Sequence, residues 1–179
     1  MDKRKIANQL VKEKITASLF QLLKEKSISE ITITEIIQSA GVARASFYRN
    51  YASKENVLIT LISDILDDYR KHLKNDGDFF YTYENIYMSF EYFQRYHEYA
   101  MDLHYYGYGS LVLHKLNQFH EEVAGTMSFK SIERYKLYMY MGSLYNTAMV
   151  WIMGGMKESI DEITDIFYHV WKDQISSNF

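Results

Sequence analysis

The chain has 179 residues, of which 47% are hydrophobic and 24% charged, a composition typical of a globular protein with a well-formed core. It contains no cysteine and no proline, so disulfides and thiolate chemistry are excluded and long helices need not be interrupted. No apolar run approaches the roughly 20 residues that cross a bilayer, and the charged start MDKRKIANQL is unlike a signal peptide. We therefore expect a cytoplasmic protein without a membrane segment.

The net charge of −3 is unevenly distributed along the chain. Residues 1–55 hold ten Lys and Arg against six Asp and Glu, a balance of +4, whereas residues 56–179 hold ten against seventeen, a balance of −7. A basic first part followed by an acidic remainder indicates that only the first part meets a polyanion.

Helical periodicity dominates the first part of the chain. Apolar residues between Ile6 and Leu23 recur at spacings of three and four, which predicts a long first helix. Thr34 is expected to cap a short second helix. Gly41 is expected to end that helix in the left-handed C′ position.

A third short helix is expected from about Ala43 to Asn50. Ser53 can then cap a fourth helix, whose apolar face runs from Val57 to Tyr69. The stretch Asn75–Asp78 has the strongest turn composition in the chain and is expected to be a loop.

Aromatic-rich helices are expected to follow, up to about Ala124, with breaks at Gly107 and Gly109 and again over Gly125–Ser128. A long helix is predicted from about 131 to 153, apolar over most of its circumference and hence buried on several sides.

A last helix is predicted over about 159–176. It begins with Ser159-Ile160-Asp161-Glu162, which has the Ser-x-x-Glu pattern of a capping box. Nothing in the sequence predicts a strand, so the fold class is expected to be all-α with about nine helices.

The two short helices, joined by Gly41-Val42 and expected to pack on the longer first helix, form a helix-turn-helix pattern. Phe47 and Tyr51 lie four residues apart and can anchor the second short helix inward. The side chains then left to face a DNA groove are Arg44, Ala45, Ser46, Tyr48 and Arg49.

Each of these residue types suits DNA recognition. Arginine can contact guanine through two hydrogen bonds, and small residues allow close approach to base edges. Phosphate contacts are expected from Thr34, Ser53 and Lys54, which place hydroxyl, ammonium and backbone N–H groups at the starts of two helices. The alternative is a three-helix subdomain with solvated arginines and no role on DNA.

The stretch TITEIIQSAGVARASFYRNYASKENVL resembles the DNA-binding domain of the tetracycline-repressor (TetR/AcrR) family of bacterial transcription regulators. The shared features are a Thr-capped second helix, the Ala-Gly-Val turn, the Phe47-Tyr48 pair and Ser-Lys-Glu before an apolar residue, while Tyr51 stands where the family has Phe. Asn50 stands where the family usually has His or Tyr, and it is included among the expected DNA contacts. Ala43 stands where a capping serine is common.

The resemblance implies a DNA-binding domain over residues 1–55 and a helical ligand-binding and dimerisation domain over 56–179. It implies a homodimer that forms through the last two helices, about 131–153 and 159–176, and binds double-stranded, palindromic operator DNA. We expect the protein to be a repressor that an unknown small-molecule effector releases from the operator. The alternatives are an activator-type regulator controlled by a protein partner, and a helical ligand- or metal-binding protein that does not bind DNA.

By analogy with the family, part of the aromatic region is expected to contact the effector, although core packing would explain the same residues. The candidates are Tyr87, Phe90, Phe93, Tyr96, His104, Tyr105, Tyr145, Met149 and Trp151. The histidines lack the spacing of a metal site, and no catalytic motif or phosphate-cradling glycine loop occurs. We therefore expect no metal, no cofactor and no enzymatic activity.

Overall fold

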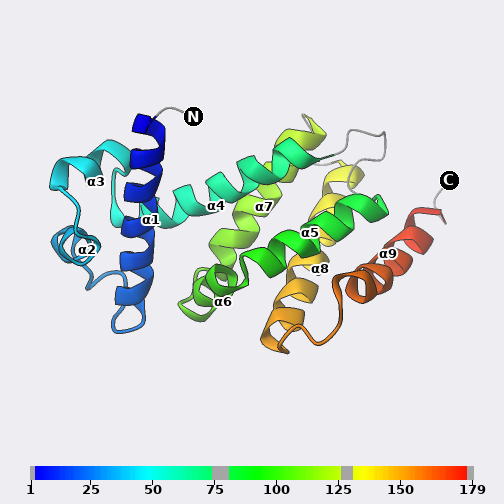
Figure 1. Ribbon diagram of the computed structural model, residues 1–179. Helices are drawn as coiled ribbons and strands as arrows, with labels where there is room; N and C mark the ends of the chain where they lie inside the picture. Colours follow the sequence, from blue (N-terminus) through cyan, green and yellow to red (C-terminus); the bar gives the residue numbers. More distant parts are fainter. Residues whose placement is uncertain (1–2, 74–80, 126–130, 177–179) are drawn as a thin grey trace. The chain divides into compact units, whose positions relative to one another are not determined.

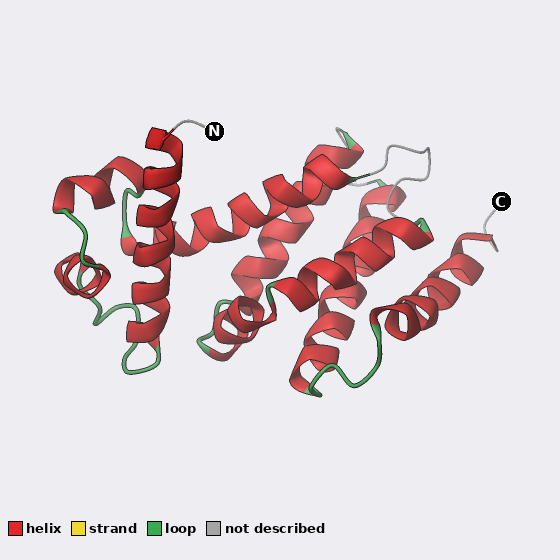
Figure 2. Cartoon of the chain, in the orientation of Figure 1, coloured by secondary structure: helices red, strands yellow, loops and turns green. Residues whose placement is uncertain are grey.

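The computed structural model describes residues 3–73, 81–125 and 131–176, and all regular structure in these ranges is α-helical (Figures 1 and 2). The described residues form nine helices, which confirms the all-α prediction. Their bounds are α1 Lys3–Leu23, α2 Ile33–Ala40, α3 Arg44–Asn50, α4 Lys54–His72, α5 Tyr83–Arg95, α6 His97–Tyr105, α7 Gly109–Ala124, α8 Ile132–Met153 and α9 Ile160–Ser176. Among these helices, none combines the length and apolar character that a bilayer crossing requires.

The chain divides into two compact units, Met1–Ile65 and Leu66–Phe179, and the division falls inside α4. The first unit thus reaches ten residues beyond the predicted boundary at 55. Val57, Leu58 and Ile62 are buried, and they lie in the part of α4 that belongs to the first unit. The first half of α4 therefore contributes to the hydrophobic core of that unit.

In the first unit, α2 and α3 pack against α1 (Figure 1). Their core contains Ile15 and Leu19 of α1, Ile36 of α2 and Phe47 of α3, each with none of its side chain exposed. Ser18 Oγ donates a 3.0 Å hydrogen bond to the Ile36 carbonyl, so the contact between α1 and α2 is polar as well as apolar.

The start of α2 differs from the prediction. Thr32, not Thr34, is the N-cap: its Oγ1 accepts from the Glu35 N–H at 3.2 Å, and the Glu35 carboxylate accepts from the Thr32 N–H at 2.8 Å. This reciprocal capping box satisfies two N–H groups, and Thr34 has no acidic partner that would allow the same arrangement. Gly41 ends α2 with φ +63, as predicted.

The core of the second unit is aromatic. Phe90 of α5 packs edge-on against Trp151 of α8 and Phe167 of α9, with ring centroids 5.9 and 5.8 Å apart. Tyr140 of α8 is 1% exposed, and its ring lies 5.6 Å from Phe167. Edge-to-face pairs of this kind add to the stabilisation from burial, so these aromatic contacts join α5, α8 and α9.

Predicted helix ends in the second unit were mostly confirmed. Gly107 has φ +85 and separates α6 from α7, and Ser159 begins α9 with a capping box to Glu162. The break at Tyr96, between α5 and α6, was not predicted. The predicted turn at 75–78 lies outside the described residues, as do residues 126–128 of the second predicted break.

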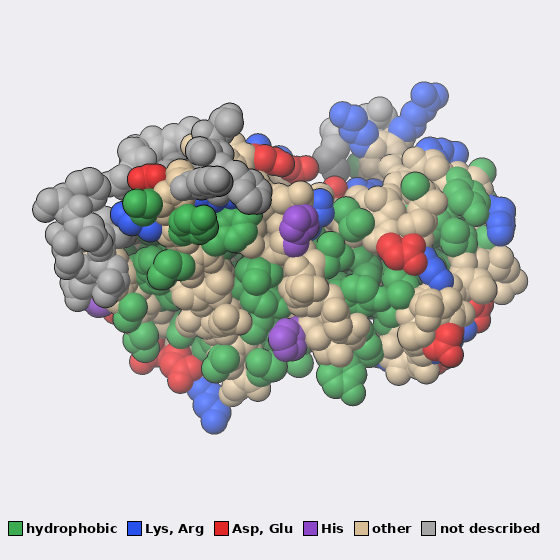
Figure 3. Space-filling view, turned by 180° about the vertical axis from the view of Figure 1, so that it is seen from behind, with side chains coloured by type: hydrophobic (Ala, Val, Ile, Leu, Met, Phe, Trp, Pro, Cys, Tyr) green, Lys and Arg blue, Asp and Glu red, His purple; other side chains and the backbone are tan. Residues whose placement is uncertain are grey.

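Large hydrophobic side chains reach the surface in several places, some of them on the face shown in Figure 3. Most of those described as exposed lie on the last two helices. They are Ile132, Tyr135, Tyr138, Met139, Val150 and Met153 on α8, and Ile166 and Val170 on α9.

Candidate nucleic-acid interface

Helix α3 is anchored by two aromatic residues. The side chain of Phe47 is fully buried, and its ring centroid lies 5.7 Å from that of Tyr51, which is 3% exposed. Burial raises the pKa of the Tyr51 phenol, and a hydrogen bond with Thr16 partly offsets this effect. The anchoring that the sequence predicted is thus confirmed, and it fixes which side of α3 faces away from the core.

The opposite side of α3 is polar and accessible. Arg44, Ala45 and Arg49 are exposed, Tyr48 is 52% exposed and Ser46 is half-buried. These are the five residues that the sequence indicated for a DNA groove. A short helix that buries one aromatic side and presents two arginines on the other matches what insertion into a major groove requires.

Arg44 connects three of the predicted residues. Its Nη2 donates to Thr34 Oγ1 at 3.3 Å, and its Cζ lies 5.7 Å from the centre of the Tyr48 ring. The guanidinium is therefore held between the first turn of α2 and the exposed face of α3. Such partial ordering lowers the conformational entropy that an exposed arginine would lose on binding.

Asn50 is engaged within the protein. Its Nδ2 donates to the Ser46 carbonyl at 2.9 Å and to Asn8 Oδ1 at 3.1 Å, while its Oδ1 accepts from Asn8 Nδ2 at 2.9 Å. The amide thus joins the end of α3 to α1. Sequence reasoning missed Asn8, because a polar residue on α1 gives no local sign that it faces another helix.

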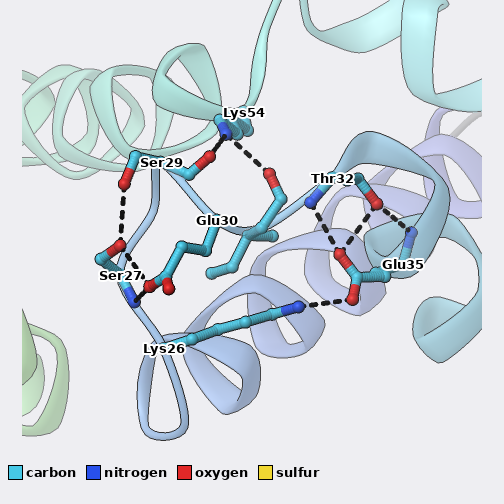
Figure 4. Close-up of polar contacts among 8 residues, drawn as sticks. Lys26, Ser27, Ser29, Glu30, Thr32, Glu35 and Lys54 are labelled. Carbon is cyan, nitrogen blue, oxygen red and sulfur yellow. Dashed lines mark hydrogen bonds and ion pairs between the residues drawn. The ribbon is translucent and has the colours of Figure 1, made fainter.

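Ser53 and Lys54 open α4 in different ways. Ser53 Oγ accepts from the Asn56 N–H at 3.2 Å, so Ser53 caps the helix as predicted. The Nζ of Lys54 donates to the carbonyl oxygens of Ser29 and Ile31, at 3.1 and 2.6 Å (Figure 4). Two of its three N–H groups are therefore already bonded to the loop that precedes α2.

That loop holds further polar contacts that the sequence did not reveal. Lys26 forms an ion pair with Glu35, and Ser27 Oγ donates to Glu30 at 2.6 Å (Figure 4). The bond from Lys26, together with the bonds from the Thr32 cap, lowers the pKa of Glu35 to about 2. The Thr-x-x-Glu pattern at residues 32–35 is the sequence feature from which the N-cap at Thr32 could have been predicted.

In the second unit, four of the nine candidate effector residues belong to the buried core. Phe90, Tyr145, Met149 and Trp151 are buried, while Tyr87, Phe93 and Tyr96 are half-buried. His104 Nδ1 lies 3.3 Å from the Tyr145 hydroxyl, a polar contact within this aromatic group.

His104 and Tyr105 are the two exposed candidates, and Tyr105 lies farthest from the core. It is 83% exposed and packs only edge-on against Tyr106 among the ring contacts described, so it does not line an interior space. The physical reason is that α6 ends at this residue and Gly107 redirects the chain. Within the described ranges, no group of three His, Asp or Glu side chains could hold a metal ion.

Residues 15–61, which run from α1 into α4, match the model of the family described as bacterial regulatory proteins, tetR family. This stretch, which holds the helix-turn-helix, is therefore similar to the N-terminal domain of TetR-family regulators. The HTH-type transcriptional regulator YvdT of Bacillus subtilis is 33% identical over 72 residues, and the match covers 37% of each chain. The aligned stretch thus spans little more than a third of that relative.

Two solved structures share this all-helical fold over nearly the whole chain. Lin0861 from Listeria innocua superposes with a TM-score of 0.71 at 11% identity, covering 97% of this chain and 94% of that one. The dihydroxyacetone kinase operon activator DhaS gives 0.56 at 14% identity, covering 93% and 96%. At these identities the similarity shows the fold alone.

Proposed function

We propose that this chain is a cytoplasmic, homodimeric transcription regulator that binds operator DNA through α3. The observation that carries the proposal is the two-sided character of α3, with Phe47 fully buried and Arg44 and Arg49 exposed on the other side. The match to the DNA-binding domain of the TetR family supports the same function. In a dimer, two α3 helices would enter successive major grooves about 34 Å apart on a palindromic site.

In this proposal the exposed residues of α3 have distinct roles. Arg44 and Arg49 contact guanine edges or phosphates, and Ala45 and Ser46 allow the helix to approach the bases closely. Tyr48 contacts a phosphate of the DNA backbone. Thr34 and Ser53, at the starts of α2 and α4, supply hydroxyl groups to the flanking phosphates.

The test of this interface is Arg49→Ala in a mobility-shift titration on DNA from upstream of the chain's own gene. If Arg49 contacts a base, the variant should bind about 1–3 kcal/mol more weakly and lose selectivity at one position. Arg95→Ala is the matched control, since Arg95 is an exposed arginine on α5, outside the first unit. If Arg49→Ala and Arg95→Ala lost equal affinity for the DNA, this result would argue against a role of α3 in recognition.

Dimerisation is proposed through an apolar stripe on α8. Ile132, Met139 and Val150 are 66, 66 and 67% exposed, whereas Leu137 and Leu144 on the other side of the helix are 1% exposed. The exposed apolar residues lie on one face of α8 in two groups, Ile132 to Met139 and Val150 to Met153, with the exposed Asn146 between them. Apolar surface of this kind favours burial against a partner. A second copy is the proposed partner, because a two-fold axis pairs such a stripe with itself.

The experiment for the dimer introduces charge into this stripe. Met139→Glu and Val150→Glu should shift the sedimentation equilibrium from dimer to monomer, because a dimer would have to bury the new carboxylates. Lys157→Glu, at an exposed site after the end of α8, is the control and should leave the mass unchanged. A wild-type protein that sediments as a monomer would contradict the proposal.

We further propose that the regulator is a repressor and that a small-molecule effector binds among the aromatic residues of the second unit. The half-buried Tyr87, Phe93 and Tyr96 lie beside the buried aromatic core and are the candidates for contact. A reporter under the upstream promoter should be more active when the gene is deleted. The activator alternative, controlled by a protein partner, predicts lower activity in the same strain.

A further inference from the structure

Lys54 lies at the start of α4, yet its side chain is directed toward a segment more than 20 residues earlier. Its Nζ donates to the Ser29 carbonyl at 3.1 Å and to the Ile31 carbonyl at 2.6 Å (Figure 4). The side chain is half-buried, so these bonds from an ammonium group to carbonyl oxygens are partly shielded from water. Hydrogen bonds from a charged donor are stronger than those between neutral groups.

The segment that Lys54 holds determines where α2 begins. The Ile31 side chain is 1% exposed and fixes the segment to the core, and Thr32 directly after it is the N-cap of α2. Glu35 completes the cap and is itself paired with Lys26. A displacement of the Ile31 carbonyl would therefore displace the cap and the first turn of α2.

That first turn is connected to the proposed DNA-reading face. Thr34 lies in it, and its hydroxyl accepts from Arg44 of α3. A continuous series of hydrogen bonds and covalent neighbours thus runs from Lys54 through Ile31 and Thr32 to Arg44.

We propose that Lys54 is a positioning residue: it holds the start of α2 against the start of α4, instead of neutralising a DNA phosphate. This inference rests on the proposed DNA-binding function. A lysine at a helix N-terminus is otherwise expected to face a phosphate. Here two of the three N–H groups of the ammonium are bonded to backbone carbonyls, which direct Nζ toward the loop before α2.

The test compares Lys54→Met, which keeps the apolar stem and removes the ammonium group, with Lys14→Met as a control. Lys14 is an exposed cation on α1, so its removal changes the net charge equally. In the absence of DNA, the amides of Glu35 and Ile36 should exchange with solvent about tenfold faster in Lys54→Met and at the wild-type rate in Lys14→Met. Circular dichroism verifies that both variants are folded.

Operator binding provides the second measurement. Lys54→Met should bind the upstream DNA more weakly than wild type, with the same slope of log affinity against log salt. A phosphate contact would lower that slope by about 1 on removal. A slope lowered by about 1, or amide exchange unchanged from wild type, would overturn the proposal.

Two arrangements keep the test decisive. If Lys54→Met does not fold, Lys54→Gln replaces it, because glutamine retains N–H donors without the charge. The amides of Glu35 and Ile36 should then exchange faster than in wild type, but less than tenfold faster. An exchange rate equal to that of wild type would count against positioning. If wild-type protein binds no DNA selectively, the proposed function fails, while the exchange measurement still decides whether Lys54 positions α2.

Discussion

His120 makes the stability of the second unit depend on pH. The residue lies on α7 and is 3% exposed, and burial lowers the pKa of its imidazole from 6.5 to about 4. Below pH 6.5 the unfolded chain therefore takes up a proton that the folded protein excludes. The stabilisation is complete above pH 6.5 and is lost as the pH falls toward 4.

The size of the effect follows from the two pKa values. A shift from 6.5 to about 4 corresponds to about 3 kcal/mol in total, of which about 2 kcal/mol is lost by pH 5. The neutral imidazole is held by a 2.8 Å contact between Nδ1 and the Leu116 carbonyl, and its ring lies 5.1 Å from that of Phe119. These contacts position the ring inside the core.

The assay is urea unfolding of wild type and His120→Gln at pH 7 and pH 5. Both tryptophans, Trp151 and Trp171, belong to the second unit, so their fluorescence reports its unfolding. When the pH is lowered from 7 to 5, the unfolding free energy of wild type should fall by about 2 kcal/mol more than that of His120→Gln. The exposed His114 provides a control, and His114→Gln should behave like wild type. If wild type and His120→Gln lost equal stability, the burial argument would be refuted.

Three further predictions concern the first unit. Its unfolding free energy should fall as the pH drops from 4.5 toward 2, because the folded-state pKa of Glu35 is lowered to about 2; Glu35→Gln should flatten that dependence in a circular dichroism titration. Ala43→Ser should stabilise the unit by about 1 kcal/mol in chemical denaturation, since Ala43 caps α3 without a side-chain bond. Phe47→Ala should cost about 3–5 kcal/mol in the same assay, and a loss under 1 kcal/mol would contradict the burial of its ring.

Local signals in the sequence were sufficient for most of the fold. The periodicity of α8 and the capping box at Ser159 predicted the last two helices within a residue of their observed starts. Gly41 was predicted correctly because a left-handed helix end strongly favours glycine. The cap at Thr32 was predictable as well, from Thr-x-x-Glu, but Thr34 was chosen in its place.

Contacts between distant segments could not be predicted in the same way. The partners of Lys54 are backbone carbonyls, which carry no sequence signal, and they lie 23 and 25 residues away. The pairing of Asn50 with Asn8 depends on how α1 and α3 pack. The break at Tyr96 has no glycine or proline to indicate it. The exposure of Tyr105 depends on where α6 ends and how the chain turns at Gly107.

The central claim, that the exposed face of α3 binds DNA, is tested most directly by fluorescence anisotropy with two duplexes of equal length. One carries the DNA upstream of the chain's own gene, and the other carries the same bases in shuffled order. We predict that the upstream duplex binds at least about a thousandfold more tightly and that both affinities fall steeply with rising salt. Equal affinity for the two duplexes, or binding that does not respond to salt, would contradict the account.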